Sequence, residues 1–344
     1  MKILKETTVG QVADTMNAEV ENDVDDVKET LDEILEANLD AREVGSNEVI
    51  NLLLTGAAGV GKTAKITQWA KANDINLYRL DAQTLDVTDM GGAIVPDETG
   101  TAIKRLTNTE LEKLNRPRSV LFLDEYNRAR SEVRATLLTL INDHVYNDAT
   151  QDSGKKYLPN FLFTVAAINP SNASYNTFDL DQAERERFYE LAVKPKVLQY
   201  LKYLMETYDE QYEKAKEAGS ERLMKKIEGK RALAQTILTN KAFHFDGEKE
   251  AEAAQMNHTS TLSPRSFSKV LELSKGKKDL LLKYWEGQCG PSMLSIVENI
   301  LKDYKDVDDK ANDALKQGTE SDVFATRSKV DSSIDMIGAW IGVK

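Results

Sequence analysis

The chain has 344 residues, of which 41% are hydrophobic and 30% charged, a composition typical of a folded globular protein. This length predicts about two domains with extensions. The net charge of −12 disfavours non-specific binding to nucleic acid or to acidic membranes. Cys289 is the only cysteine, so no disulfide can form within the chain. The N-terminus lacks the apolar stretch of a signal peptide and no run reaches the length of a membrane span, so we expect a cytoplasmic protein without a membrane partner.

The first 46 residues are acidic and carry a helical pattern. One apolar stripe recurs at steps of three and four residues, formed by Val24, Val27, Leu31, Ile34 and Leu35. The pattern favours a helix that packs on the core of the protein, and an arm that docks a partner is the alternative. We assign residues 1–46 to an acidic, helical N-terminal extension.

Short apolar runs alternate with helical stretches between residues 47 and 194. The expected strands are Val49–Leu54, Ile75–Leu80, Val120–Leu123, Phe161–Ile168 and Phe188–Val193, and the expected helices include Thr63–Ala72 and Arg130–Asn142. The strands lack a strict period of two, as is typical of parallel strands that are buried on both faces. The alternation therefore predicts an α/β domain with a parallel sheet covered by helices.

Strand signals end after Pro195, and helical patterns continue to about residue 306. Leu198–Ala218 reads as a long charged helix, and a second charged stretch follows to about Arg231. Shorter helices are expected to begin at Pro264, near Asp279 and near Pro291. We therefore expect a helical domain over 195–306. The remaining polar segment, residues 307–344, is expected to be a partly disordered tail in which Trp340 either docks or packs on the body.

A glycine-rich sequence follows the first expected strand and opens the first expected helix. It matches the pattern G-x-x-x-x-G-K-[ST] with Gly56, Ala57, Ala58, Gly59, Val60, Gly61, Lys62 and Thr63. Small residues let such a loop curl so that its backbone N–H groups and the helix N-terminus point at phosphate oxygens. Lys62 would bind the β and γ phosphates of ATP, and the Thr63 hydroxyl would bind Mg²⁺.

Two acids, Asp124 and Glu125, follow the apolar strand Val120–Leu123. Ligands of open parallel sheets sit at the carboxyl ends of the strands, which places Asp124 beside the phosphate-binding loop as a second Mg²⁺-binding residue. Glu125 is then placed to orient and deprotonate a water. An acid pair by itself is common at helix N-termini. The preceding loop on the same sheet is what indicates a hydrolytic site.

The segment Asp124–Ala129 resembles the D-E-x-N-R-A signature of MoxR-type AAA+ ATPases and their dynein-related relatives. The resemblance covers residues 47–195 and one motif near residue 265. It implies a P-loop AAA+ core, a helical lid and assembly into a ring, with a hexamer as the expected form. Asp86–Gly92 resembles the family's loop after the second strand. Two further segments, Ala93–Ile103 and Val145–Phe161, resemble the hairpins that the family inserts in its second helix and before its sensor strand.

The resemblance also implies roles for three further residues. Asn169, at the end of the strand Phe163–Ile168, would be the sensor that holds the hydrolytic water opposite Glu125. Arg187 aligns with the arginine finger that a neighbouring subunit supplies, with Glu186 in place of the usual aspartate. Arg185 remains an alternative finger. In the helical domain, Arg265 would be a second sensor that reaches the γ-phosphate.

The helix start at Ser263 and Pro264 fits that placement of Arg265, since serine is a good N-cap and proline suits the first helical position. The charged stretch Tyr208–Arg231 departs from the family, because it is longer than the usual lid segment, and it leaves the lid's topology open.

The function expected from these features is Mg²⁺-dependent ATP hydrolysis that remodels a protein client. Relatives often work with a partner that carries a von Willebrand A-type domain. One alternative is a motor or loader directed to DNA. It would use Lys104 and Arg105, which follow the first hairpin segment, and Lys155 and Lys156, which lie in the second. The other is a nucleotide switch or scaffold that does not hydrolyse ATP, and the intact pair Asp124 and Glu125 argues against it.

Overall fold

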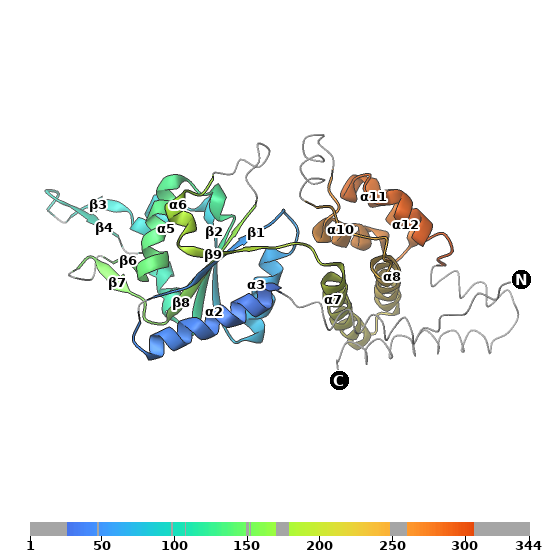
Figure 1. The fold of residues 1–344 in the computed structure, drawn as a ribbon, viewed down its shortest axis with the longest axis horizontal. Coiled ribbons are helices and arrows are strands. Elements are labelled where there is room, and N and C mark those ends of the chain that lie inside the picture. The colour runs from blue at the N-terminus through green and yellow to red at the C-terminus, as the bar shows by residue number, and fades with distance from the viewer. Residues whose placement is uncertain are drawn as a thin grey trace, which may run out of the picture. The chain divides into compact units, whose positions relative to one another are not determined.

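The computed structural model describes residues 26–46, 48–97, 99–106, 108–148, 151, 153–169, 179–247 and 260–305. The chain divides into two units, one formed by Asp25–Lys194 and one that takes up the chain again at Pro195 (Figure 1). Most of the predicted N-terminal extension, up to residue 25, and the predicted tail over 307–344 with Trp340 lie outside the described residues.

The first unit is built on a five-stranded sheet with the order β2-β5-β8-β1-β9, in which every neighbouring pair is parallel. The strands are β1 (Asn51–Thr55), β2 (Asn76–Asp81), β5 (Ser119–Asp124), β8 (Phe161–Ile168) and β9 (Phe188–Ala192). Every residue of β5 and β8 is buried, which agrees with their largely apolar sequences. The predicted parallel sheet is confirmed, and each strand lies within two residues of its expected bounds.

Alternate side chains of the strands pack into two separate cores, one on each face of the sheet. Leu52, Leu54 and Phe122 pack with α2 (Asp26–Glu43) and α3 (Lys62–Ala72). Leu53, Leu121 and Leu123 pack on the opposite face with α5 (Ser131–Asp143). Figure 1 shows α2 and α5 on opposite sides of the strands. The parallel sheet is thus covered on both faces, as the fold class requires.

The predicted N-terminal stripe is part of this packing. Val27, Leu31, Ile34 and Leu35 are buried on α2. Polar contacts fasten the same helix: Asn38 exchanges hydrogen bonds of 3.0 and 2.9 Å with the backbone of Ile50, and Asp32 accepts a 2.7 Å bond from the indole of Trp69. The described part of the N-terminal segment is therefore a helix packed on the sheet, and its apolar stripe is not available to a partner.

Two antiparallel hairpins interrupt the α/β unit. The first pairs β3 (Ile94–Pro96) with β4 (Ile103–Arg105), and the second pairs β6 (Val145–Asn147) with β7 (Lys155–Tyr157). The second lies within its predicted segment, and the first begins within its predicted segment but extends two residues past the predicted end at Ile103. The prediction of a loop over Asp86–Gly92 is wrong. The structure has a short helix there, α4 (Val87–Gly91), because Asp86 and Asp89 form a reciprocal capping box at its start.

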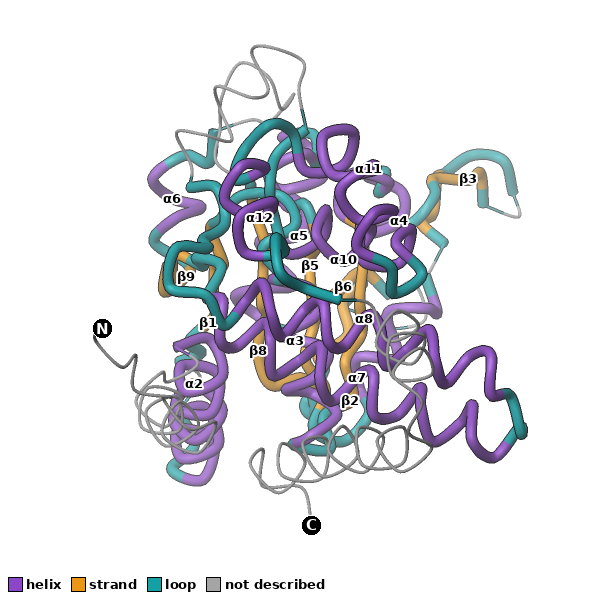
Figure 2. The backbone as a smooth tube through the Cα atoms, turned by 90° about the vertical axis from the view of Figure 1, so that its right-hand side faces the viewer, coloured by secondary structure: helices purple, strands orange, loops and turns teal. Residues whose placement is uncertain are grey.

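The second unit is helical, as predicted. Its helices are α7 (Val197–Glu217), α8 (Glu221–Leu238), α10 (Pro264–Ser274), α11 (Lys278–Cys289) and α12 (Leu294–Ile300), and they enclose a core that contains Phe267 and Trp285. The charged stretch that departs from the family forms the adjoining parts of α7 and α8, which run side by side from a turn at Gly219, with φ of +64° (Figure 2). No helix in the described part of the chain is both long and apolar enough to cross a membrane.

Candidate active site

The predicted phosphate-binding loop joins the end of β1 to the start of α3. Gly59 and Gly61 have φ of +86° and +100°, a left-handed conformation that favours glycine. At Gly56 a Cβ atom would lie 2.5 Å from the carbonyl oxygen of Val193, so only glycine fits beside this backbone. The glycines of the motif thus allow the tight strand–loop–helix connection, with α3 opening directly after the loop.

The ammonium group of Lys62 lies inside this loop. Its Nζ donates hydrogen bonds to the carbonyl oxygens of Gly56 and Ala57, at 2.6 and 3.1 Å, and to Oδ1 of Asn169 at 2.9 Å. Lys62 is only 8% exposed, and Asn169 is buried at the end of β8. The structure therefore brings the predicted sensor asparagine, 107 residues away in the chain, to the lysine of the loop.

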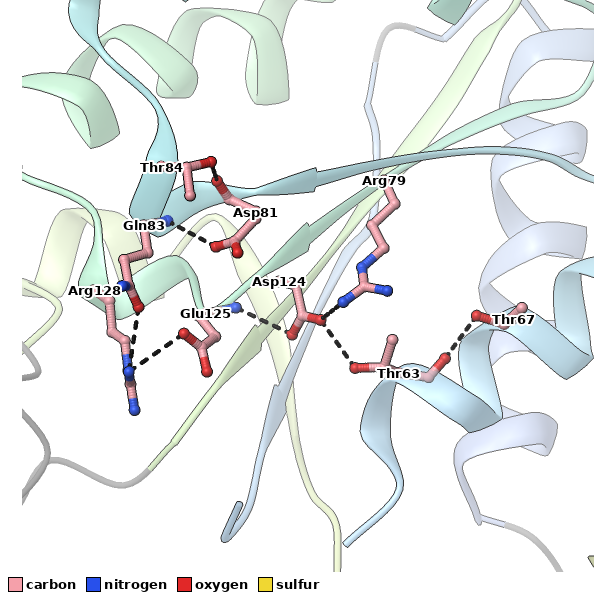
Figure 3. A network of polar contacts seen from close by, with 9 residues as sticks. All are labelled: Thr63, Thr67, Arg79, Asp81, Gln83, Thr84, Asp124, Glu125 and Arg128. Carbon is pink, nitrogen blue, oxygen red and sulfur yellow. Dashed lines mark hydrogen bonds and ion pairs between the residues drawn. The ribbon is translucent and has the colours of Figure 1, made fainter. Parts of the chain in front are cut away.

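Asp124 ends β5 next to the start of α3. Its Oδ2 accepts hydrogen bonds from the Thr63 hydroxyl at 3.0 Å and from Nη2 of Arg79 at 2.7 Å, while its Oδ1 accepts a 3.2 Å bond from the backbone N–H of Glu125 (Figure 3). An ionised carboxylate has about four acceptor positions, so this one can still bind a metal ion or accept a hydrogen bond from a metal-bound water. The three donors also fix its orientation.

The oxygens of Thr63 and Asp124 are the kind of ligands that Mg²⁺ takes. The ion usually keeps several waters and binds one or two protein oxygens together with phosphate oxygens of its substrate. Among the described residues, no group of three or more His, Cys, Asp or Glu side chains is arranged to hold a metal by itself. The pair therefore fits a magnesium ion that arrives with a nucleotide.

Glu125 lies in a tight turn at the end of β5. Its φ of +53° is unusual for a residue with a side chain, and such conformations concentrate at functional sites. Two buried side chains stabilise the turn. Tyr126 is fully buried with its ring 5.9 Å from that of Phe188, and Asn127 donates a 2.8 Å hydrogen bond to the carbonyl oxygen of Asn169. The asparagine of the D-E-x-N-R-A segment thus joins the end of β5 to the end of β8, which carries Asn169.

The predicted finger Arg187 immediately precedes β9, which pairs in parallel with β1 from Phe188 opposite Asn51 to Ala192 opposite Thr55. The phosphate-binding loop follows Thr55, so Arg187 lies at the opposite end of the sheet, roughly 13 Å or more along the strands from the loop. Its side chain is exposed, and no hydrogen bond or ion pair joins its guanidinium to another residue in the part of the chain that the structure describes. This position does not allow Arg187 to reach the loop of its own chain.

Two ion pairs distinguish the surroundings of Arg185 and Arg187. Arg185 pairs with Glu190 at 2.9 Å, whereas Arg187 has no such partner among the described side chains. The helix α6 (Gln182–Arg185) is anchored to α5 by a buried pair between Arg134 and Glu184 at 2.7 Å. Exposure and the free guanidinium therefore favour Arg187 over Arg185 as a residue that acts outside its own chain.

The predicted second sensor, Arg265, is an exposed residue in the first turn of α10. Ser263 caps this helix by accepting a 3.2 Å hydrogen bond from the N–H of Ser266, and Pro264 occupies the first turn, so the predicted helix start is confirmed. Arg265 belongs to the helical unit, and the contacts described above do not include it. Its role remains a prediction.

Three polar residues of the site were not predicted from their sequence context: Arg79 on β2, Gln83 in η1 (Ala82–Thr84) and Arg128 in η3 (Tyr126–Arg128). Arg128 appeared only as part of the signature. A signal for Arg79 was present, because a charged residue stood in a strand expected to be apolar. Nothing in the sequence showed that this residue would reach the end of the neighbouring strand.

Residues 51–190 match the family model described as "ATPase family associated with various cellular activities (AAA)". The match begins with β1 and ends within β9, so it covers four strands of the sheet completely, part of the fifth, and the residues around Lys62, Asp124 and Asn169. A search of curated proteins found no match for the chain. Fold and match together define an α/β P-loop core of the AAA+ class followed by a helical lid. The match supports nucleotide-dependent activity of the AAA type, whereas the MoxR-type branch remains a prediction.

Proposed function

We propose that the protein is a Mg²⁺-dependent ATPase that works as a ring, most simply a hexamer, and uses hydrolysis to remodel a protein client. The observation that carries the proposal is the convergence of Lys62, Thr63, Asp124 and Asn169, which come from three different strand ends and are joined by hydrogen bonds of 2.9 and 3.0 Å. This is the arrangement of charge and oxygen ligands that the β and γ phosphates of ATP and their magnesium ion require.

In this proposal, water attacks the γ-phosphorus in line with the departing β-phosphate oxygen. The loop over 56–61 binds the phosphates through its backbone N–H groups, and Lys62 neutralises part of their charge. Thr63 and Asp124 hold Mg²⁺, which when bound stabilises the charge that develops on the phosphate oxygens. Glu125 takes a proton from the water, and Asn169 helps to hold that water.

Two arginines complete the proposed site: Arg187 from a neighbouring subunit and Arg265 from the helical unit. Arg187 acts on the ATP of a neighbouring subunit, which is supported by its exposed side chain at the far end of the sheet. Arg265 contacts the γ-phosphate from the lid, so that the nucleotide state changes the preferred lid position. The requirement for Arg187 in trans is the reason to expect a ring.

We propose that the client is a protein. A partner with a von Willebrand A-type domain, the kind with which relatives often work, is one candidate. The two hairpins carry exposed apolar side chains, among them Ile94, Ile103 and Tyr157, which suit contact with another polypeptide. The alternative of a DNA-directed motor is less well supported. Of the basic residues it would use, Lys156 pairs with Glu112 at 2.6 Å, and the chain as a whole carries a net charge of −12.

The decisive experiment is steady-state ATPase of the Glu125→Gln variant. If Glu125 is the general base, turnover falls by about 10²–10⁴-fold while ATP still binds, because the change removes the base but leaves the phosphate-binding residues in place. Glu132→Gln, an exposed change in the first turn of α5, is the matched control and keeps wild-type turnover. Near wild-type turnover of Glu125→Gln would remove Glu125 from its proposed role.

The same variant addresses the client. Because it should hold ATP without hydrolysing it, it is the form expected to retain a bound client long enough for pull-down. ATPase stimulation by DNA with a steep dependence on salt would favour the DNA-directed alternative. A complete lack of turnover by the wild-type protein in a single-turnover assay would favour a nucleotide switch.

A further inference from the structure

The turn at the end of β5 brings two oppositely charged side chains together. The backbone N–H of Arg128 donates a 2.9 Å hydrogen bond to the carbonyl oxygen of Glu125, which closes the turn. On the outer side of this turn, Nη1 of Arg128 lies 3.4 Å from Oε2 of Glu125. The residues between them, Tyr126 and Asn127, point inward and are buried. The two middle residues therefore anchor the backbone of the turn, and the side chains of Glu125 and Arg128 pair with each other on its outer side.

The same guanidinium nitrogen has a second partner in another element. Nη1 of Arg128 donates a 3.2 Å hydrogen bond to Oε1 of Gln83, so it stands between the amide and the carboxylate (Figure 3). Gln83 lies in η1, directly after β2. That segment is tied to the end of β2, because Asp81 accepts a 3.2 Å bond from the Gln83 N–H through its side chain and a 2.8 Å bond from the Thr84 hydroxyl through its backbone.

Stability alone does not account for this arrangement. The side chains of Glu125 and Arg128 are 35% and 26% exposed, and partly exposed ion pairs contribute little to folding. The pair instead restricts the orientation of the Glu125 carboxylate. A general base has to be held close to its productive position, and a misplacement of about 1 Å can reduce the rate by about 10²-fold. A planar guanidinium with several donors can hold a carboxylate while it is itself held by an amide oxygen.

We propose that Arg128 and Gln83 are positioning residues for Glu125. Gln83 anchors the guanidinium from the end of β2, and the guanidinium holds the carboxylate of Glu125 in the orientation that the turn gives it. This inference rests on the proposed role of Glu125 as the base. It assigns a task to the arginine of the D-E-x-N-R-A segment and adds a residue, Gln83, that lies outside the segment.

The test is a set of substitutions measured by ATPase kinetics. Arg128→Ala should lower kcat by about tenfold or more and leave the KM for ATP within about twofold, because the phosphate-binding residues are untouched. Arg128→Lys should recover part of the loss, since it restores a cation near Glu125. The matched control is Arg130→Ala, which removes an exposed arginine two residues further along the chain and should keep wild-type kinetics. Thermal unfolding of each variant verifies that it is folded.

A double-mutant cycle tests the chain of contacts. Gln83→Ala should lower kcat by roughly threefold alone and have no further effect when Arg128 is already alanine, because its effect passes through the guanidinium. Equal losses in both backgrounds, or unchanged kcat in Arg128→Ala, would overturn the proposal. So would a tenfold rise in KM, since it would mean that Arg128 binds the nucleotide itself. A wild-type protein that does not depend on Glu125 would instead contradict the proposed function.

Discussion

Thr63 donates a 3.0 Å hydrogen bond to the carboxylate of Asp124, although the two residues are 61 positions apart in the chain. The bond joins the first turn of α3 to the end of β5, and it places both oxygens that we assign to Mg²⁺ side by side. The contact depends on the sheet order, in which β5 and β1 are separated only by β8. It also makes the hydroxyl of Thr63 a specific target for substitution.

Thr63→Ala should lower Mg²⁺-dependent ATP turnover by roughly 10- to 100-fold, since hydrogen bonds to charged groups are typically worth about 1.5–3 kcal/mol and a metal ligand is lost as well. Thr63→Ser keeps the hydroxyl and is the control that should retain most of the activity. The measurement is initial rate against Mg²⁺ concentration at saturating ATP. Equal activity of the alanine and serine variants would show that the hydroxyl has no part in binding the metal.

Arg79 offers a second prediction about the metal, because its guanidinium pairs with the same Oδ2 of Asp124 at 2.7 Å. A cation there competes electrostatically with Mg²⁺ for the carboxylate. Arg79→Ala should therefore reduce the Mg²⁺ concentration needed for half-maximal activity by a few-fold, and Arg79→Lys should lie closer to the wild type. A higher Mg²⁺ requirement in the alanine variant would mean that Arg79 acts mainly by orienting Asp124.

The sequence was sufficient to predict the sheet and several of the residues that meet at its edge, because these features depend on local patterns. Largely apolar runs marked the strands, and the glycine-rich motif marked the loop that joins β1 to α3. The rest depended on which strands become neighbours. Arg79 reaches Asp124 only because β2 lies beside β5, and Gln83 reaches Arg128 only because both follow those adjacent strands. Short caps have the same limitation, since the helix at Val87–Gly91 depends on contacts between the Asp86 and Asp89 side chains and backbone N–H groups.

The buried His144 predicts how stability depends on pH. It ends α5 with a φ of +52°, is 3% exposed and lies 4.3 Å from the ring of Phe161. Burial, assisted by the positive charge of Arg42, lowers the pKa of His144 from 6.5 to about 4. The unfolded chain therefore binds a proton that the folded chain excludes as pH falls through this range. Stability from this residue is complete above about pH 6.5 and is lost progressively down to about pH 4.

Between pH 7 and pH 5 this linkage should cost about 2 kcal/mol of unfolding free energy. His144→Asn removes the titration and suits the left-handed backbone, so its stability should fall less over the same range, whatever its stability at pH 7. Urea unfolding of both proteins at the two pH values gives the comparison. If the two proteins lose the same amount, protonation of His144 does not limit the stability of this unit at low pH.

The geometry of Arg187 predicts complementation between subunits. Arg187 immediately precedes Phe188, which pairs with Asn51 at the far end of the sheet from the loop that follows Thr55. This position excludes a role at the loop of its own chain, so an Arg187→Ala chain keeps an intact pocket but cannot complete that of its neighbour. Both Arg187→Ala and Lys62→Ala proteins should be nearly inactive alone, since a finger is typically worth about 10³–10⁵ in rate. Mixed rings bring an intact Lys62 next to an intact Arg187 at some interfaces, and the mixture should recover a measurable fraction of wild-type ATPase.

Arg185→Ala is the control, and it should lose little, because Arg185 is already paired with Glu190 in its own chain. Mixtures that stay inactive, although native mass spectrometry shows mixed rings, would place the finger on a residue other than Arg187.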